Sequence, residues 1–192
     1  MKKILSLVLV LAMALSLAAC GKKAETTETT GVPAQEMPAS ALEVLETIWA
    51  DYAEDEKFAV IGGSMAAPVD GAPGSYDIAD ENITYNLLIP AEQLGNVTEA
   101  ASMIHMMNAN TFTCGVFKLA EGVSAADFGA AMKEAVMGNQ WMCGFPETLL
   151  VRNFGDVYVL VAFGINDAMN PFIQHMDNVY PGFETIVNEP IV

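Results

Sequence analysis

Two pairs of β-rich runs, each pair joined by a short turn, limit the folds open to this chain more than any other feature. Asn108-Ala109-Asn110 separates the first pair, and Phe154-Gly155-Asp156 separates the second. Asn, Asp and Gly are the residues that tight hairpin turns prefer. The sequence therefore predicts two antiparallel hairpins. Their strands are expected at residues 97–107, 111–119, 149–152 and 157–163.

The first of these runs, 97–107, also fits a helix. Its apolar residues recur at helical spacing, and Asn96 together with Glu99 could cap such a helix. The turn signal after it, followed by a clear strand at 111–119, favours a hairpin instead. Both alternatives stay open on the residues alone, and the strand is the preferred interpretation.

Two helices are predicted from their capping residues. Ser40 and Glu43 are typical of a capping box, in which each side chain accepts a hydrogen bond from an unpaired backbone N–H. The apolar spacing that follows predicts an amphipathic helix at 41–53. Ser124 is predicted to cap a second helix, whose apolar residues also recur at helical spacing, and Gly138 is expected to end it.

The segments before and after the two hairpins have weaker signals. Asn170-Pro171 is typical of an N-cap and first helical residue, so a third helix is expected from there to Pro181. A short strand is expected at 58–61, and the Gly-, Pro- and Ser-rich stretch 62–77 is predicted to be a loop. The tail to Val192 is predicted to be extended.

The order of these elements indicates the fold class. One helix, two strands, a helix, two strands and a last helix suit an α+β domain. We expect a single antiparallel sheet built from two hairpins, with helices packed on a face. Residues 40–192 show no second break in composition and no internal repeat, so they are expected to form one globular domain.

The N-terminus has the three parts of an export signal. Met1-Lys2-Lys3 is basic, residues 4–16 are apolar, and the small residues Ala18 and Ala19 precede Cys20. Leu17-Ala18-Ala19-Cys20 resembles the lipobox of bacterial lipoproteins. The resemblance implies that residues 1–19 are a signal peptide, that a diacylglyceryl group is attached to Cys20, and that this cysteine begins the mature chain.

This segment has two alternative interpretations. A transmembrane anchor is disfavoured because Ile4–Ala19 is shorter than the about 20 apolar residues that a spanning helix needs. A signal with an ordinary cleavage site would leave Cys20 as a free thiol. Residues 20–39 are rich in Thr, Glu, Lys and Pro, so they are expected to be the lipid anchor and a flexible tether.

The charge of the chain excludes one class of partner. The net charge is −16, and the basic residues beyond residue 39 are Lys57, Lys118, Lys133 and Arg152. Nucleic acid would be repelled, because its affinity for proteins comes mainly from Lys and Arg at phosphates. Anionic headgroups would be repelled too, so membrane attachment is expected to depend on the lipid at Cys20. The acidic surface could attract cations or basic peptides, or could serve solubility alone.

Cys114 and Cys143 remain as a pair once Cys20 is lipidated. An exported protein permits a disulfide between them, which would contribute about 3 kcal/mol. The alternative is that Cys114 is a small buried hydrophobe, because it lies in an apolar, strand-like run.

No catalytic or metal-binding signature is complete. The chain has two histidines, His105 and His175, and the methionines around His105 are expected to fill the core rather than bind copper. Gly62-Gly63-Ser64-Met65-Ala66 lacks the glycine that ends a nucleophile elbow. The acidic residues near Asp70 do not follow a calcium-loop pattern. We therefore expect no cofactor and no bound metal.

One segment stands out as a binding site. Trp141 and Phe145, with the amides Asn139 and Gln140, lie in a connection from a helix to a strand. Rings can stack on a sugar or a peptide while amides form hydrogen bonds. The alternative is that both rings close the end of the core and the amides cap backbone groups.

The order of elements over about residues 40 to 180 also resembles that of small lipoproteins of Gram-positive anaerobes which carry a domain of unassigned function. This resemblance implies the fold and the location but no active-site residues. The sequence thus predicts a lipid-anchored, extracytoplasmic module that binds a small molecule or a protein without covalent chemistry. The alternative is an extracytoplasmic hydrolase with a carboxylate-based site.

Overall fold

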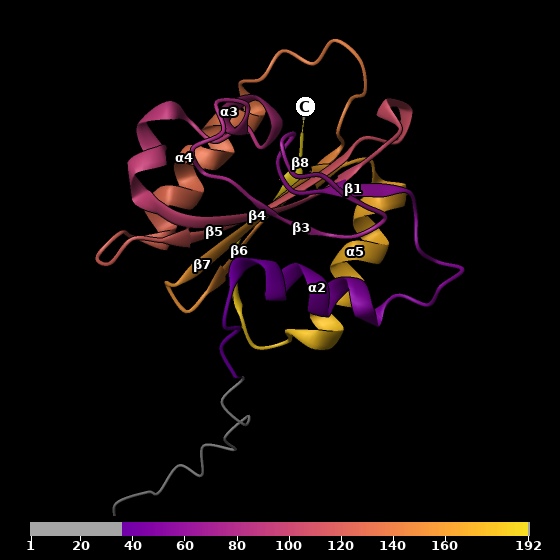
Figure 1. Cartoon of the computed structure of the whole chain (residues 1–192), viewed down its shortest axis with the longest axis horizontal. Coiled ribbons are helices and arrows are strands. Elements are labelled where there is room, and N and C mark those ends of the chain that lie inside the picture. Colours follow the sequence, from indigo (N-terminus) through magenta and orange to yellow (C-terminus); the bar gives the residue numbers. More distant parts are fainter. Residues whose placement is uncertain (1–35, 192) are drawn as a thin grey trace, which may run out of the picture. The chain divides into compact units, whose positions relative to one another are not determined.

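One open antiparallel sheet of eight strands organises the part of the chain that the structure describes (Figure 1). The structure is a computed structural model, and it describes residues 36–191. The spatial order is β2-β1-β4-β5-β7-β6-β8, with β3 paired to β4. The strands are β1 (Val60–Gly62), β2 (Val69–Asp70), β3 (Gly74–Tyr76), β4 (Val97–His105), β5 (Phe112–Leu119), β6 (Thr148–Phe154), β7 (Tyr158–Gly164) and β8 (Glu184–Pro190).

The fold is therefore broadly α+β, and its sheet is larger than the sequence indicated. The neighbouring strands β4 and β5 pair with each other, as do β6 and β7. Four further strands extend this centre at both edges. Strands β2 and β3 lie within the predicted loop 62–77, and β8 is the predicted extended tail, which pairs with β6.

The ambiguous run 97–107 is mostly strand, because β4 covers Val97–His105. Its middle residues, Ala100 to Met103, are all buried. A strand covered on both faces contains apolar residues at consecutive positions, so the alternation expected of a half-buried strand is lost. This burial is the reason that the apolar pattern also fitted a helix.

The turn between β6 and β7 follows directly from its sequence. Gly155 and Asp156 both have positive φ, 62° and 58°, and Val157 N–H donates to Phe154 C=O at 3.1 Å. Turns with two central residues of positive φ match the right-handed twist of the strands they join. The side chain of Asn153 accepts a hydrogen bond from Asp156 N–H at 2.8 Å and stabilises this turn.

Helices cover both faces of the sheet rather than one (Figure 1). Along β7, Leu160 and Ala162 belong to one buried cluster, and Val159 and Val161 belong to the other. The first cluster packs under α2 (Ala41–Asp51) and α5 (Asn166–Val179), and the second under α4 (Ala125–Met137) and the short α3 (Ile83–Asn86). We call these two sides the α2/α5 face and the α4 face.

Both predicted caps are confirmed. Ser40 Oγ accepts a hydrogen bond from Glu43 N–H at 3.0 Å, while the Glu43 carboxylate accepts one from Ala39 N–H at 2.6 Å. Ser124 Oγ accepts one from Asp127 N–H at 3.2 Å. Such caps satisfy N–H groups that have no partner within the helix.

The predicted start of the third helix is wrong. Helix α5 begins at Asn166, and Pro171 lies inside it. Asn166 N–H donates to the Glu147 carboxylate at 2.7 Å, and the Asn166 side chain accepts a hydrogen bond from Thr148 Oγ1 at 2.7 Å. These contacts with the start of β6 fix the first turn of the helix earlier than the proline signal suggested.

The N-terminal predictions lie outside the described residues. They concern the signal peptide 1–19, Cys20 and the tether as far as residue 35. The described residues all belong to one compact unit, Ala34–Val192. Within residues 36–191, no helix combines the length and the apolarity that crossing a membrane requires.

Candidate functional site

A cavity of about 380 Å³ opens on the α4 face, where the predicted binding segment lies. We call it the amide–aromatic pocket. Its walls come from the connection between α4 and β6, from the segment around α3, and from the ends of β4, β5 and β7. The lining residues are Tyr85, Asn86, Leu88, Ile104, Asn108, Thr113, Asn139, Gln140, Trp141, Met142, Cys143 and Phe163.

The α4–β6 connection, residues 138–147, is held against the turn between β4 and β5. Gly144 has a φ of +77°, and a Cβ atom on it would lie 2.5 Å from the backbone oxygen of Asn108. Only glycine adopts this conformation readily and also permits this approach. Thr111 Oγ1 donates to the same Asn108 oxygen at 2.9 Å. This hydrogen bond stabilises the β4–β5 turn at the point where Gly144 contacts it.

Trp141 and Phe163 of β7 line the pocket side by side. Their ring centroids are 5.6 Å apart at an interplanar angle of 53°. Trp141 packs against the buried cluster of the α4 face but stays half-buried, so it both closes the core and lines the pocket. Its Nε1–H is buried and has no hydrogen-bond partner among the described residues. An unsatisfied buried donor of this kind costs about 1–3 kcal/mol.

Another part of the lining comes from the end of α3 and from Leu88 just after it. Leu88 has a φ of 54°, a left-handed conformation that costs a leucine about 1–2 kcal/mol. Backbone strain of this kind gathers at binding and catalytic sites. Asn86 is fixed because its Nδ2 donates to the Tyr76 hydroxyl at 2.8 Å. Tyr85 is 82% exposed at the rim.

The structure brings together three of the four predicted binding residues. Asn139, Gln140 and Trp141 line the pocket, whereas Phe145 does not line it and is 65% exposed. Tyr85 and Met142, the latter 89% exposed, also line the pocket and were not predicted from the sequence. Their exposed surfaces are accessible to a ligand. Nothing in the pattern around Tyr85 indicated that α3 would face the α4–β6 connection.

The chemistry of the pocket is neutral. Among its described lining residues there is no Asp, Glu, Lys, Arg or His, although the whole chain carries 24 Asp and Glu residues. The polar groups are amides, a hydroxyl of threonine, the phenol of Tyr85 and the thiol of Cys143. The arrangement can form hydrogen bonds and stack rings.

The disulfide considered from the sequence is not formed in the structure. Cys114 is buried and Cys143 is exposed, and both are free. Cys114 belongs to the cluster on the α2/α5 face, while its strand neighbour Thr113 lines the amide–aromatic pocket on the other face. Since successive side chains of a strand point to opposite faces, the sheet separates the two thiols. Burial raises the pKa of Cys114 well above its ordinary value.

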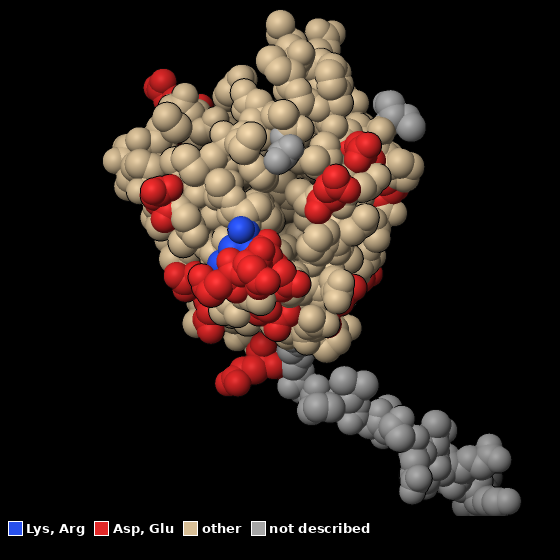
Figure 2. Space-filling view, turned by 90° about the vertical axis from the view of Figure 1, so that its right-hand side faces the viewer, with Lys and Arg blue, Asp and Glu red and all other residues tan. Residues whose placement is uncertain are grey.

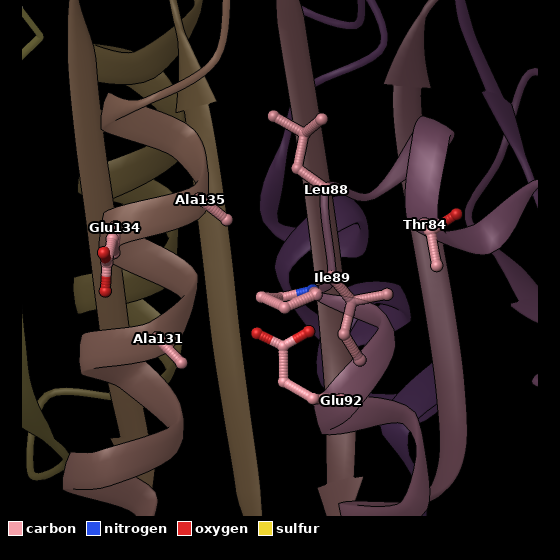
Figure 3. A pocket seen from close by; sticks show the side chains of 8 residues that line it. Thr84, Leu88, Ile89, Glu92, Ala131, Glu134 and Ala135 are labelled. Atoms are coloured by element: carbon pink, nitrogen blue, oxygen red, sulfur yellow. The ribbon is translucent and has the colours of Figure 1, made fainter.

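A second cavity on the α4 face holds two carboxylates. It has a volume of about 440 Å³ and lies between α4 and the segment from Thr84 to Glu92 (Figure 3). Figure 3 shows Glu92 extending into the gap between its own segment and α4, whereas Glu134 lies on the side of α4 away from that gap. Paired catalytic carboxylates must flank one reacting bond. These two do not converge in that way.

The methionines around His105 are divided between the core and the surface. Met103 is buried, whereas Met106 and Met107 are exposed. The His105 ring stacks on Phe58 with centroids 5.1 Å apart, and its Nδ1 accepts a hydrogen bond from Met107 N–H at 2.9 Å. In the part of the chain that the structure describes, no three His, Cys, Asp or Glu side chains are grouped to hold a metal ion.

Comparison of this chain with protein families, with curated proteins and with solved structures found no match. The amide–aromatic pocket is therefore identified by its own geometry as the candidate functional site.

Proposed function

We propose that this protein is a lipid-anchored extracytoplasmic module that binds a neutral ligand in the amide–aromatic pocket without covalent chemistry. The observation that carries the proposal is the lining of that pocket, which combines rings and amides with no charged side chain among the described residues. The chain has a net charge of −16, so a lining without any acidic side chain differs from the composition of the rest of the chain. Charged ligands would lose their hydration there without gaining a partner.

The lining indicates the class of ligand. Trp141, Phe163 and Tyr85 offer ring surfaces, and Asn139 and Gln140 offer both donors and acceptors. Binding sites of this kind hold apolar groups and fix their orientation with a few polar contacts. A sugar ring or an uncharged stretch of peptide has this combination of apolar faces and hydrogen-bonding groups.

The same lining argues against catalysis at this site. General acid–base chemistry uses His most often, and then Asp, Glu, Lys, Tyr or Cys. Of these types, only Tyr85 and Cys143 occur among the described lining residues. The alternative function, a hydrolase with a carboxylate-based site, would have to use the cavity of Figure 3, where Glu92 and Glu134 do not converge. The geometry favours binding.

Lipid attachment at Cys20, after removal of residues 1–19, would hold the module at the outer surface of the cell membrane. Leu17-Ala18-Ala19-Cys20 and the acidic composition support this location, because anionic headgroups would not retain the domain without a lipid. The frame of the binding site, by this proposal, is the pair of hairpins β4–β5 and β6–β7, with helix α4 packed on their face.

Affinity capture from intact cells tests the proposal. The anchored protein is compared with a Trp141→Ala variant and with a Phe145→Ala variant as the matched control, since Phe145 is exposed and lies outside the pocket. We expect Trp141→Ala to lose the captured ligand and Phe145→Ala to retain it. Equal recovery by all three proteins would refute the site. Mass spectrometry of the native protein tests the anchor, and an unacylated Cys20 would refute it.

A further inference from the structure

A third cavity, on the α2/α5 face, differs from the amide–aromatic pocket in its charge. Its volume is about 230 Å³, below the ~300–1,000 Å³ typical of sites for larger ligands, so it suits a small molecule. We call it the aromatic–acidic cavity. It lies between the connection from α2 to β1, the end of β4, and the first turns of α5. The lining residues are Tyr52, Glu56, Phe58, His105, Ile165, Asp167, Ala168 and Pro171.

Three rings of this cavity are held in place by stacking. Phe58 lies nearly parallel to His105, at an interplanar angle of 8°. Tyr52 stacks on His175 of α5 with centroids 3.8 Å apart. His175 in turn contacts the Asp51 carboxylate through Nδ1 at 2.8 Å. The aromatic walls are therefore preorganised before any ligand arrives.

The charged groups of the cavity are negative. Glu56 and Asp167 line it, and none of its described lining residues is Lys or Arg. The nearest lysine in the sequence, Lys57, instead pairs with Glu54 at 2.6 Å and lies over the Trp49 ring. Burial lowers the pKa of His105, so its ring is neutral at neutral pH and does not oppose a bound cation. The α2–β1 connection lies on the side seen in Figure 2, where acidic side chains gather with few basic atoms among them.

One polar group at the cavity has no partner. Tyr52 is only 3% exposed, and its hydroxyl has no hydrogen-bond partner among the described residues. A buried hydroxyl without a partner is unusual, because native proteins satisfy most such groups. The hydroxyl oxygen is itself buried, so the ring of Tyr52, and not its oxygen, contributes to the cavity wall.

We propose that the aromatic–acidic cavity binds a small organic ammonium ion. The cation lies among the aromatic walls near Glu56 and Asp167. Rings and carboxylates together attract such a cation, since aromatic faces are negative and a weakly hydrated ammonium loses little by leaving water. This site is separate from the amide–aromatic pocket and takes a ligand of different charge.

Calorimetric titration with choline tests the proposal, with 3,3-dimethylbutan-1-ol as the uncharged molecule of the same shape. The protein is the full chain with Cys20→Ser. We expect choline to bind at least about tenfold more tightly than the alcohol, because only the cation gains from the rings and carboxylates. No binding of choline at millimolar concentration, or equal binding of the two compounds, would overturn the proposal.

Variants assign the binding to this cavity. Glu56→Gln with Asp167→Asn keeps the shape and is expected to weaken choline binding by about tenfold or more. Tyr52→Phe keeps the ring and removes only a buried hydroxyl, so it is expected to bind choline as the parent does. Glu54→Gln, in the same connection but outside the lining, is the control for general surface charge and should bind as the parent does. An equal loss in Glu54→Gln would refute the cavity as the site. Trp141→Ala should bind choline normally, which separates this test from the proposed function.

Urea unfolding of each variant gives a second readout. If Glu56→Gln with Asp167→Asn lowers stability, the comparison of choline with the uncharged alcohol on the parent chain still decides whether a cation is preferred. Unchanged choline binding in a folded Glu56→Gln, Asp167→Asn variant would also refute the proposal.

Discussion

Gly144 approaches Thr111 so closely that a Cβ atom on the glycine would lie 2.1 Å from the threonine Oγ1. Gly144 belongs to the α4–β6 connection, and Thr111 precedes β5. This contact joins the segment that carries Asn139, Gln140 and Trp141 to the turn between β4 and β5. The amide–aromatic pocket therefore depends on one glycine for its shape.

Gly144→Ala is expected to lower the free energy of unfolding by about 1–3 kcal/mol, because the new Cβ forces both a left-handed strain and a clash. Gly122→Ala is the matched control: its φ is +82°, but nothing lies within 4 Å of the added atom. Urea unfolding measures both. Equal losses in the two variants would show that the close approach to Thr111 is unimportant.

Cys114 and Cys143 are expected to react very differently. In a chain with Cys20→Ser, a maleimide should label Cys143 rapidly and leave Cys114 unlabelled until the protein unfolds. Cys114 is fully buried, and burial raises its pKa, so the reactive thiolate is scarce and inaccessible. Mass spectrometry counts the labels before and after urea. Protection of both thiols in the native protein under oxidising conditions would instead indicate a disulfide.

Asp51 links α2 to α5 and should make stability depend on pH. Hydrogen bonds from Asn178, and next from His175, hold the pKa of Asp51 below its ordinary value of 3.8. The charged carboxylate therefore stabilises the fold fully above pH 3.8, and this contribution is lost as the pH falls through the lowered pKa. Asp51→Asn should be less stable than the parent at neutral pH.

The stability difference between Asp51→Asn and the parent should shrink as the pH falls below 3.8. Urea unfolding across this range measures it. A difference that stays constant at acidic pH would contradict the proposed linkage.

Arg152 is 6% exposed, and its guanidinium group contacts two partners at once. Nη1 donates to the Phe183 carbonyl at 2.8 Å, and Nη2 pairs with Asp177. Arg152→Lys is expected to cost about 1–3 kcal/mol, because an ammonium cannot reproduce both contacts. Lys133→Arg is the control, since Lys133 pairs with Glu189 at the surface and such pairs contribute at most about 1 kcal/mol. Similar effects of the two changes would show that Arg152 is not specifically held.

Local signals in the sequence predicted the elements that depend on neighbouring residues. Ser40 and Ser124 cap helices because each hydroxyl reaches an N–H three residues along the chain. Gly155 and Asp156 form a turn because both adopt positive φ. In contrast, Pro171 suggested a helix start that is wrong. The helix begins earlier, at Asn166, because Asn166 forms hydrogen bonds with Glu147 and Thr148.

Elements that depend on distant partners could not be predicted in the same way. Strand β8 has no strong pattern of its own and is a strand because it pairs with β6. The same holds for the pocket. Trp141 was predicted from its own segment, whereas Tyr85 and Leu88 line the pocket only because the fold brings a distant segment beside it. Phe145 was grouped with Trp141 by sequence position, but its exposed ring lies outside the cavity.

Protection of Cys143 from alkylation tests the central claim most directly, because this exposed thiol lines the amide–aromatic pocket. Extracts of cell envelopes are separated by ion exchange into neutral, cationic and anionic fractions, and each is added to the Cys20→Ser chain before a maleimide. We predict that a neutral fraction slows the labelling of Cys143 in the parent and in Phe145→Ala but not in Trp141→Ala. Protection by charged fractions alone, or equal protection of the Trp141→Ala variant, would contradict the account.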